Sequence, residues 1–222
     1  MRGLYPIVDV DSLRELGNHP LSLIAFAERL LLAKPPVLQL RAKHSGARDT
    51  LELLRALRPL CTRAGVRLFA NDRPDLAVLA ECDGVHVGQD DLPLSVVRQI
   101  APGLLVGVST HNREQLVAAL AEQPDYVALG PVYGTVSKER PDPLVGPSLL
   151  AEAYLATRSV GIPLVAIGGV TLERAREIAA HCDLVAVIAA LQPDKASLDG
   201  VSEAASALHA ALGPANARRS LA

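Results

Sequence analysis

The 222-residue sequence has few aromatic residues and no large excess of charge of either sign. Aromatic side chains make up 3% of the chain and tryptophan is absent, which leaves too few rings for the stacking platforms that bind single-stranded nucleic acid. The formal net charge is -2 at pH 7 and the pI is near 6.3, which argues against a surface for nucleic acid or for an anionic membrane. We therefore expect neither nucleic acid nor a membrane as a partner.

The cysteines and the apolar runs exclude further classes. Cys61, Cys82 and Cys182 are odd in number and far apart, which gives neither a metal-ligand spacing nor a disulfide framework and is typical of a reducing cytosol. No apolar run is long enough to span a bilayer, and a strand-like run beginning at Leu4 leaves no room for a signal peptide. We therefore expect a cytoplasmic protein. Since 50% of the residues are hydrophobic and few are aromatic, we also expect a sizeable core of Leu, Val, Ile and Ala.

What the chain does contain is a regular alternation of short apolar runs with longer helical patterns, which is typical of parallel sheets built from βαβ units. The expected strands are Leu4–Val8, Val37–Arg41, Arg67–Ala70, Gly84–Val87, Leu104–Val108, Tyr126–Leu129, Leu164–Ile167 and Leu184–Ile188. The expected helices are Leu21–Ala33, Ala47–Ala64, Pro74–Ala80, Leu94–Ile100, Arg113–Glu122, Ser148–Arg158, Leu172–His181 and Leu198–Leu212. Eight such pairs in a chain of 222 residues predict the α/β class and a single (β/α)8 TIM barrel. The barrel domain is expected to span residues 1–212, with residues 213–222 as a flexible C-terminal tail.

In such a barrel the chemistry lies where the strands end and the following loops begin. The polar residues and glycines found at these positions, from the second strand to the seventh, are Gln39, Arg41, Lys43, Asn71, Asp72, Gln89, Asp90, Asp91, Ser109, His111, Thr135, Ser137, Lys138, Gly168 and Gly169. Lys138 lies in the long loop between Gly130 and Gly146, which we expect to act as a lid over a ligand.

The stretch from Phe69 to Asp91 brings two carboxylates to neighbouring strand ends. Asp72 closes the third strand and Asp91 follows the fourth. Two carboxylates that meet there would suit Mg²⁺ holding a phosphorylated substrate. Each aspartate also precedes a helix start and could serve as an N-cap, and the two roles can coexist on different oxygens.

Basic residues and glycines suggest anion sites. Only four of the 22 Lys and Arg residues are lysines, and a chain that prefers Arg would keep Lys where a compact point charge is wanted. Arg41 and Lys43 alternate at the end of the second strand and so point to one side, which favours an anion site over a surface ion pair. Gly168 and Gly169 would let backbone N–H groups approach a phosphate, although a tight turn needs glycine in any case.

The histidines and Ser109 are less specific. His86 alternates with valines inside a strand, which indicates a hydrogen-bonded interior residue rather than a catalyst. His111 follows a strand end and is therefore better placed than His86 to act as a catalyst. Its neighbours Thr110 and Asn112 are both candidates for the N-cap of the next helix. Ser109 has no base–nucleophile context, which argues against a hydrolase triad.

The order of these motifs resembles that of thiamine-phosphate synthase. The elements that carry the resemblance are LQLRAK (38–43), AND (70–72), DGVHVGQDDLP (83–93), GVST (107–110), DYVALGPVYGTVSK (125–138) and VAIGGV (165–170). The resemblance implies a (β/α)8 barrel that joins 4-amino-5-hydroxymethyl-2-methylpyrimidine diphosphate to a thiazole phosphate, carboxylated or not. The products would be thiamine phosphate and diphosphate.

The resemblance also implies roles for particular residues. Asp72 and Asp91 would be the ligands of a Mg²⁺ cofactor. The residues implied to hold the pyrimidine diphosphate are Gln39, Arg41, Lys43, Asn71, Ser109 and Lys138, with Arg41, Lys43, Ser109 and Lys138 as the catalytic set. The residues implied on the thiazole-phosphate side are Thr135, Ser137 and Gly168, with Gly169 beside it. The chain departs from the family pattern on that same side, at Gly134, at Glu173 or Arg174, and at Ala189.

Such a reaction needs positioning and electrostatic stabilisation of a leaving diphosphate rather than a side-chain nucleophile. Two alternatives stay open. A thiazole tautomerase of the same barrel superfamily would use His111 as a base, and a phosphate-ligand-binding barrel would bind without catalysis. The small-molecule substrates are the expected partners, and the sequence is compatible with a homo-oligomer.

Overall fold

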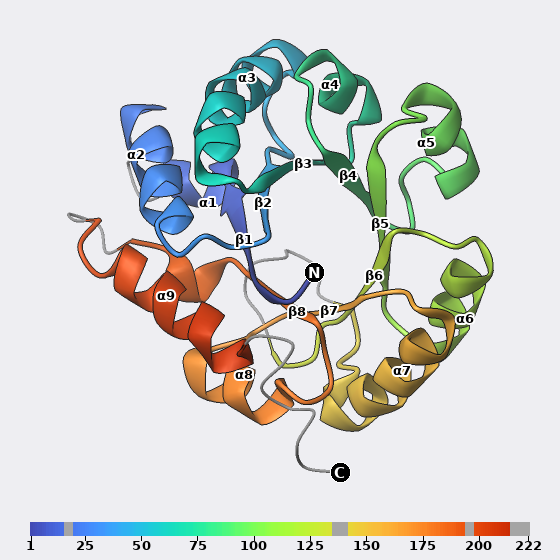
Figure 1. Cartoon of the computed structure of the whole chain (residues 1–222). Helices are drawn as coiled ribbons and strands as arrows, with labels where there is room; N and C mark the ends of the chain where they lie inside the picture. The colour runs from blue at the N-terminus through green and yellow to red at the C-terminus, as the bar shows by residue number, and fades with distance from the viewer. Residues whose placement is uncertain (16–19, 135–141, 194–197, 214–222) are drawn as a thin grey trace.

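The computed structural model describes residues 1–15, 20–134, 142–193 and 198–213, and in it eight parallel strands close into a barrel. Neighbouring strands pair in chain order, and β8 pairs with β1 to close the ring. The strands form an inner ring and the helices an outer one (Figure 1). The prediction of a single (β/α)8 TIM barrel is confirmed.

The strands are β1 (Gly3–Asp9), β2 (Val37–Arg41), β3 (Arg67–Asn71), β4 (Gly84–Val87), β5 (Leu105–Thr110), β6 (Tyr126–Leu129), β7 (Leu164–Ile167) and β8 (Leu184–Val187). The helices are α1 (Val10–Glu15), α2 (Pro20–Leu31), α3 (Ala47–Ala64), α4 (Pro74–Leu79), α5 (Leu94–Ile100), α6 (Arg113–Ala121), α7 (Gly146–Val160), α8 (Leu172–Ile178), α9 (Val201–Leu212) and the 3-10 turn η1 (Ala189–Leu191). Every expected strand is present, whereas α1 and η1 were not expected. The start of α1 is explained by Asp9, whose carboxylate accepts a hydrogen bond from the Ser12 N–H at 2.9 Å.

The barrel interior is more aromatic than the composition suggests. Of the 4 Tyr and 2 Phe in the chain, Tyr5, Phe69 and Tyr126 are buried there in contact with one another. Glycines make room for these rings, since a Cβ on Gly107 would lie 1.9 Å from Cζ of Tyr126. The expectation of an aliphatic core is therefore right for most of the layer between strands and helices, and the centre of the barrel combines aliphatic side chains with these three rings.

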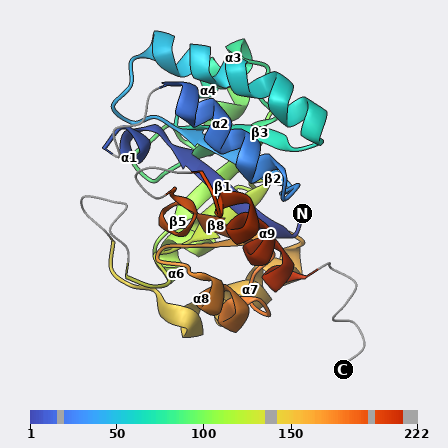
Figure 2. The same cartoon turned by 90° about the vertical axis from the view of Figure 1, so that its left-hand side faces the viewer.

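The last helix closes the outer ring. Helix α9 packs against β1 and lies between α2 and α8 (Figure 1). Its His209 accepts a hydrogen bond from the Leu4 N–H at 3.2 Å. In Figure 2 the N-terminus marks the end of the barrel at which the strands begin, so their carboxyl ends lie at the opposite end.

Two further expectations concern the chain as a whole. Within the described residues, no helix has both the length and the apolar character needed to cross a membrane. Of the tail expected at residues 213–222 the structure describes only Gly213, so the tail and the domain boundary stay predictions.

Candidate active site

A cavity of about 740 Å³ opens at the carboxyl ends of the strands and receives side chains from all eight of them. This volume lies in the range of roughly 300–1,000 Å³ that is usual for small-molecule sites. The sequence-predicted residues that line it are Gln39, Arg41, Lys43, Asn71, Asp72, Asp91, Ser109, Gly168 and Gly169. Thr135, Ser137 and Lys138 lie outside the described residues. The structure therefore brings together every predicted site residue that it describes.

The acidic pair lies at the ends of β3 and β4. Asp72 has a left-handed backbone with φ 63, which is uncommon for non-glycine residues and is adopted most readily by aspartate and asparagine. Its N–H donates to the His86 carbonyl at 2.8 Å, which fixes it against β4. The Asp91 carboxylate turns back and accepts the Gly88 N–H at 2.7 Å. Burial, and then the hydrogen bond between the Asp91 and Asp72 side chains, raise the pKa of Asp91.

Neither aspartate caps the helix that follows it. The N-cap positions of α4 and α5 are Arg73 and Pro93, and neither end receives a side-chain cap hydrogen bond. The N-cap alternative for Asp72 and Asp91 is therefore wrong, and both carboxylates are left for the cavity.

These carboxylates fit a hard cation that is only partly held by protein. The described part of the chain contains no cluster of three or more His, Cys, Asp or Glu side chains that could hold a metal ion. Mg²⁺ commonly binds one or two carboxylates and completes its octahedron with substrate phosphates and water. The contact between Asp72 and Asp91 fits that arrangement better than it fits a cage built by protein alone.

Two cations on β2 and its loop are each held by a carboxylate. Lys43 Nζ lies 2.9 Å from Asp72 Oδ2, which places its charge beside the acidic pair. Arg41 forms an ion pair with Asp9, whose side chain is 2% exposed. A buried carboxylate needs such a partner, and the pair fixes the guanidinium at the cavity wall. Asp9 was missed by the sequence reasoning, although it stands at the end of the first apolar run.

The two histidines differ in their contacts. His86 is buried and hydrogen-bonded through both ring nitrogens, to Tyr126 Oη and Ser109 Oγ, each at 2.8 Å. Burial lowers the pKa of His86 to about 4, so the ring is neutral at pH 7. The interpretation of His86 as a satisfied interior residue is therefore right, although its ring also reaches the cavity.

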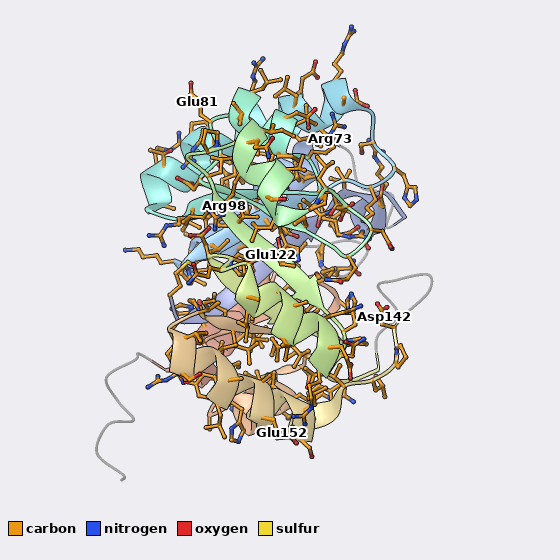
Figure 3. The ribbon with its side chains drawn as sticks, turned by 90° about the vertical axis from the view of Figure 1, so that its right-hand side faces the viewer. Arg73, Glu81, Arg98, Glu122, Asp142 and Glu152 are labelled. Carbon is orange, nitrogen blue, oxygen red and sulfur yellow. The ribbon has the colours of Figure 1, made fainter. Side chains whose placement is uncertain are left out.

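His111 lies at the cavity mouth. Its Nδ1 donates to the Gly130 carbonyl at 2.6 Å, and the same atom lies 3.6 Å from an Asp142 oxygen. In Figure 3, Asp142 and Arg73 lie toward the same end of the barrel, with Glu81 toward the other. Of the two caps that the sequence leaves open, Thr110 and Asn112, it is Asn112 that caps α6, by accepting the Gln115 N–H at 2.8 Å.

The turn after β7 packs directly on the loop after β6. Gly168 and Gly169 have φ 98 and 61, and a Cβ on Gly168 would lie 2.5 Å from Cβ of Pro131. Both glycines are therefore required by the backbone and by the close approach of the two loops. The loops are brought together next to the cavity.

Arg174 of α8 is one of the two residues, Glu173 or Arg174, at which the sequence departs from the family pattern on the thiazole-phosphate side, and the sequence reasoning gave it no binding role. Its Nη1 donates to the Gly169 carbonyl at 2.6 Å, and its guanidinium lies 4.7 Å from the centre of the Tyr133 ring. It lines the cavity, and among the described residues no carboxylate lies within ion-pair distance of it. The sequence located this position after the Gly168-Gly169 turn, and the structure adds that Arg174, rather than Glu173, packs on Tyr133 and lines the cavity.

A barrel whose carboxyl end holds a cavity lined by fixed cations and paired carboxylates is typical of TIM-barrel enzymes. A family model described as thiamine monophosphate synthase matches residues 4–191, and the chain therefore belongs to that family. The prediction of an enzyme, a transferase of thiamine biosynthesis, is confirmed.

Individual relatives agree with this assignment. The thiamine-phosphate synthase of Koribacter versatilis is 45% identical over 199 residues, covering 86% of this chain and 89% of the relative. That of Methanospirillum hungatei is 39% identical, covering 88% of this chain and 93% of the relative. A solved thiamine phosphate pyrophosphorylase from Pyrococcus furiosus is 29% identical, with a TM-score of 0.79 and coverage of 95% of both chains.

Proposed function

We propose that the protein joins 4-amino-5-hydroxymethyl-2-methylpyrimidine diphosphate to a thiazole phosphate and releases thiamine phosphate and diphosphate. The observation that carries the proposal is the Asp72–Asp91 contact with Lys43 Nζ 2.9 Å from Asp72. A cation beside two touching carboxylates suits a diphosphate held jointly by side chains and a divalent cation.

The chemistry has two bond changes. The bond between the pyrimidine methylene carbon and the diphosphate oxygen breaks, and its electron pair leaves with the diphosphate. The aminopyrimidine ring stabilises the methylene cation that remains, and the lone pair of the thiazole nitrogen forms the new C–N bond. No proton has to be removed from the attacking nitrogen, so a side-chain nucleophile or strong base is not required.

The protein's part is to bind and to neutralise. Arg41 and Lys43 line the side of the cavity next to the acidic pair and would hold the diphosphate. Asp72 and Asp91 would hold Mg²⁺, which when bound would neutralise part of the diphosphate charge. Lys138 is expected to add a further cation and lies outside the described residues.

The thiazole phosphate would bind at the other side of the cavity, beside the turn after β7. Gly168 and Gly169 let the backbone approach a ligand there, and Arg174 adds a positive charge that no described carboxylate neutralises. Its contacts with Gly169 and Tyr133 hold the guanidinium in place before any ligand binds. The two anionic groups of the substrates would thus meet two separate sets of cations.

An assay of the purified protein with both substrates and Mg²⁺ tests the proposal. We expect thiamine phosphate to form, and Asp91→Asn to lower kcat strongly while keeping the Gly88 hydrogen bond. Asp49→Asn, an exposed carboxylate in the first turn of α3, is the matched control and should leave the rate unchanged. Failure of wild-type protein to form product, or full activity in Asp91→Asn, would refute it.

The same assay separates the alternatives. Conversion of a thiazole phosphate alone, without Mg²⁺, would favour the tautomerase with His111 as base. Binding of both substrates without turnover would favour the non-catalytic barrel. A cytoplasmic location and a homo-oligomeric assembly stay predictions.

A further inference from the structure

Four hydrogen bonds form a continuous chain across the interior of the barrel. The chain runs from Gln39 Nε2 to Tyr5 Oη, to Tyr126 Oη, through the two ring nitrogens of His86, and to Ser109 Oγ. Each contact measures 2.8 Å, and the residues come from β2, β1, β6, β4 and β5 in that order. The two ends, Gln39 and Ser109, are residues of the proposed pyrimidine site.

The middle of the chain is neutral at pH 7. Burial raises the pKa of Tyr5 and of Tyr126, so both hydroxyls keep their protons. The two ring nitrogens of His86 each lie 2.8 Å from a hydroxyl oxygen, and a ring with one N–H donates to one of these hydroxyls and accepts from the other. Each member therefore has one proton to donate along the chain, and a buried hydroxyl that donated to nothing would be costly.

The orientation of the Gln39 amide sets the direction of these protons. Because Gln39 Nε2 donates to Tyr5 Oη, the Tyr5 hydroxyl is satisfied only by donating to Tyr126. Tyr126 then donates to His86 Nδ1, which must be the unprotonated nitrogen. The proton of the imidazole consequently sits on Nε2 and points to Ser109 Oγ.

The ends of the chain are left with defined roles. Ser109 Oγ already accepts a hydrogen bond from His86 Nε2–H, so its own hydroxyl hydrogen is available to donate into the cavity. Among the described residues nothing donates to Gln39 Oε1, and that atom is not one of the fully buried atoms without a partner. Gln39 therefore offers an acceptor to the cavity and Ser109 offers a donor.

We propose that Tyr5, Tyr126 and His86 are positioning residues that fix this proton direction, so that Ser109 donates to the ligand and Gln39 accepts from it. An aminopyrimidine diphosphate carries both complements, an exocyclic amino group that donates and ring-nitrogen and phosphate oxygen atoms that accept. That ligand rests on the proposed function, whereas the proton direction does not. If the four hydrogen bonds ran in the opposite direction, Gln39 would offer a donor and Ser109 an acceptor, and neither would match the same ligand.

NMR of the protein labelled with ¹⁵N-histidine tests the direction without any substrate. The His86 signals would be identified by their absence from His86→Gln. At pH 7 we expect His86 to carry its proton on Nε2, with Nδ1 unprotonated. A proton on Nδ1 would overturn the proposal, even in a protein that proves to be an active synthase. The expected tautomer would stand even if no thiamine phosphate were formed.

The variant Tyr126→Phe tests the positioning role. It keeps the ring that packs on Phe69 and His86 and removes the hydroxyl that donates to Nδ1. We expect a mixture of His86 tautomers, and a fall of about tenfold in kcat/KM for the pyrimidine substrate, as one misdirected hydrogen bond would give. KM for the thiazole phosphate should not change.

Tyr154→Phe on α7 is the matched control, because Tyr154 lies outside the chain and its ring would still carry Arg158. It should change neither the tautomer nor the kinetics. An unchanged His86 tautomer in folded Tyr126→Phe would refute the role of the tyrosines. If Tyr126→Phe does not fold, Tyr5→Phe replaces it, because it interrupts the same series of hydrogen bonds one bond further from His86. The measurement is again the tautomer of His86.

Discussion

The stability of the protein should fall in mild acid because His86 is buried and neutral. In the unfolded chain a histidine binds its proton near pH 6.5, whereas folded His86 binds one only near pH 4. Between these two pH values the unfolded state holds more protons than the folded state, so acid favours unfolding. The contribution of His86 is fully present above about pH 6.5 and is lost as the pH falls toward 4.

The magnitude follows from the same two values. A difference of about 2.5 pKa units, at about 1.4 kcal/mol per unit, corresponds to a loss of about 3 kcal/mol between pH 7 and pH 4. That is a large share of the 5–15 kcal/mol by which domains are usually stable. Carboxylates will also respond in this range, so the contribution of His86 has to be isolated by a variant.

The contribution of His86 to the free energy of unfolding can be measured by urea unfolding followed by far-UV circular dichroism, since the protein has no tryptophan to report by fluorescence. His86→Gln should be less stable than wild type at pH 7, because it disturbs two buried hydrogen bonds. The gap between the two proteins should narrow by about 3 kcal/mol by pH 4, as the variant has no imidazole to protonate. His181→Gln, at an exposed position, should follow wild type throughout. A gap between wild type and His86→Gln that stays constant with pH would refute the reasoning.

Two further predictions concern the turn after β7. Arg174→Ala should raise KM for the thiazole phosphate by about tenfold to a hundredfold, the usual worth of a charge-assisted hydrogen bond, with KM for the pyrimidine diphosphate unchanged. Arg176→Ala, at an exposed position on the same helix, is the control and should leave this KM unchanged. If Arg174→Ala raised KM for a thiazole alcohol that lacks the phosphate as much as KM for the thiazole phosphate, the charge argument would be contradicted. Gly168→Ala should lower the free energy of unfolding by about 1–3 kcal/mol, because it combines a left-handed φ of 98 with a Cβ 2.5 Å from Pro131. The control is Gly103→Ala, at an exposed position where an added Cβ would meet nothing within 4 Å, and it should change stability little. Equal melting temperatures for Gly168→Ala and Gly103→Ala would contradict the steric argument.

The barrel and its strand ends were predictable because both depend on local pattern. Short apolar runs separated by helical patterns predict the βαβ order, and the carboxyl ends of parallel strands necessarily meet at one face. The sequence therefore placed Gln39, Asn71, Asp72, Asp91 and Ser109 together, and in the structure all five line one cavity. Their individual contacts depend on packing that no spacing reveals, and the N-cap alternative for the two aspartates was wrong for this reason.

The residues that were missed act through contacts between distant segments. Asp9 became a partner of Arg41 only because β1 lies beside β2. Tyr5 and Tyr126 are 121 positions apart, and their hydroxyls meet because both rings enter the barrel from different strands. Composition pointed to an aliphatic core, and it could not show that the few rings in the chain gather in one place.

Aspartates are used in opposite ways at the two ends of the barrel. At the end where strands begin, Asp83, Asp125 and Asp183 each accept a backbone N–H of the preceding strand, at 2.7–3.0 Å. The same local sequence, an aspartate two residues before a strand valine, recurs at all three positions. These carboxylates satisfy backbone groups that would otherwise be unpaired, and two of the three also pair with an arginine.

At the other end, Asp72 sits in a left-handed backbone, and Asp91 is buried beside it with a raised pKa. Two carboxylates in contact repel when both are charged, and the ion pair of Lys43 with Asp72 offsets part of that repulsion. The aspartates at the beginning of the strands therefore stabilise the barrel, whereas the pair at the carboxyl ends carries a repulsion that a bound cation would reduce further. Aspartates thus stabilise the end of the barrel where strands begin and destabilise the end where strands finish. This difference is expected when the residues at the carboxyl ends are kept for function rather than for folding.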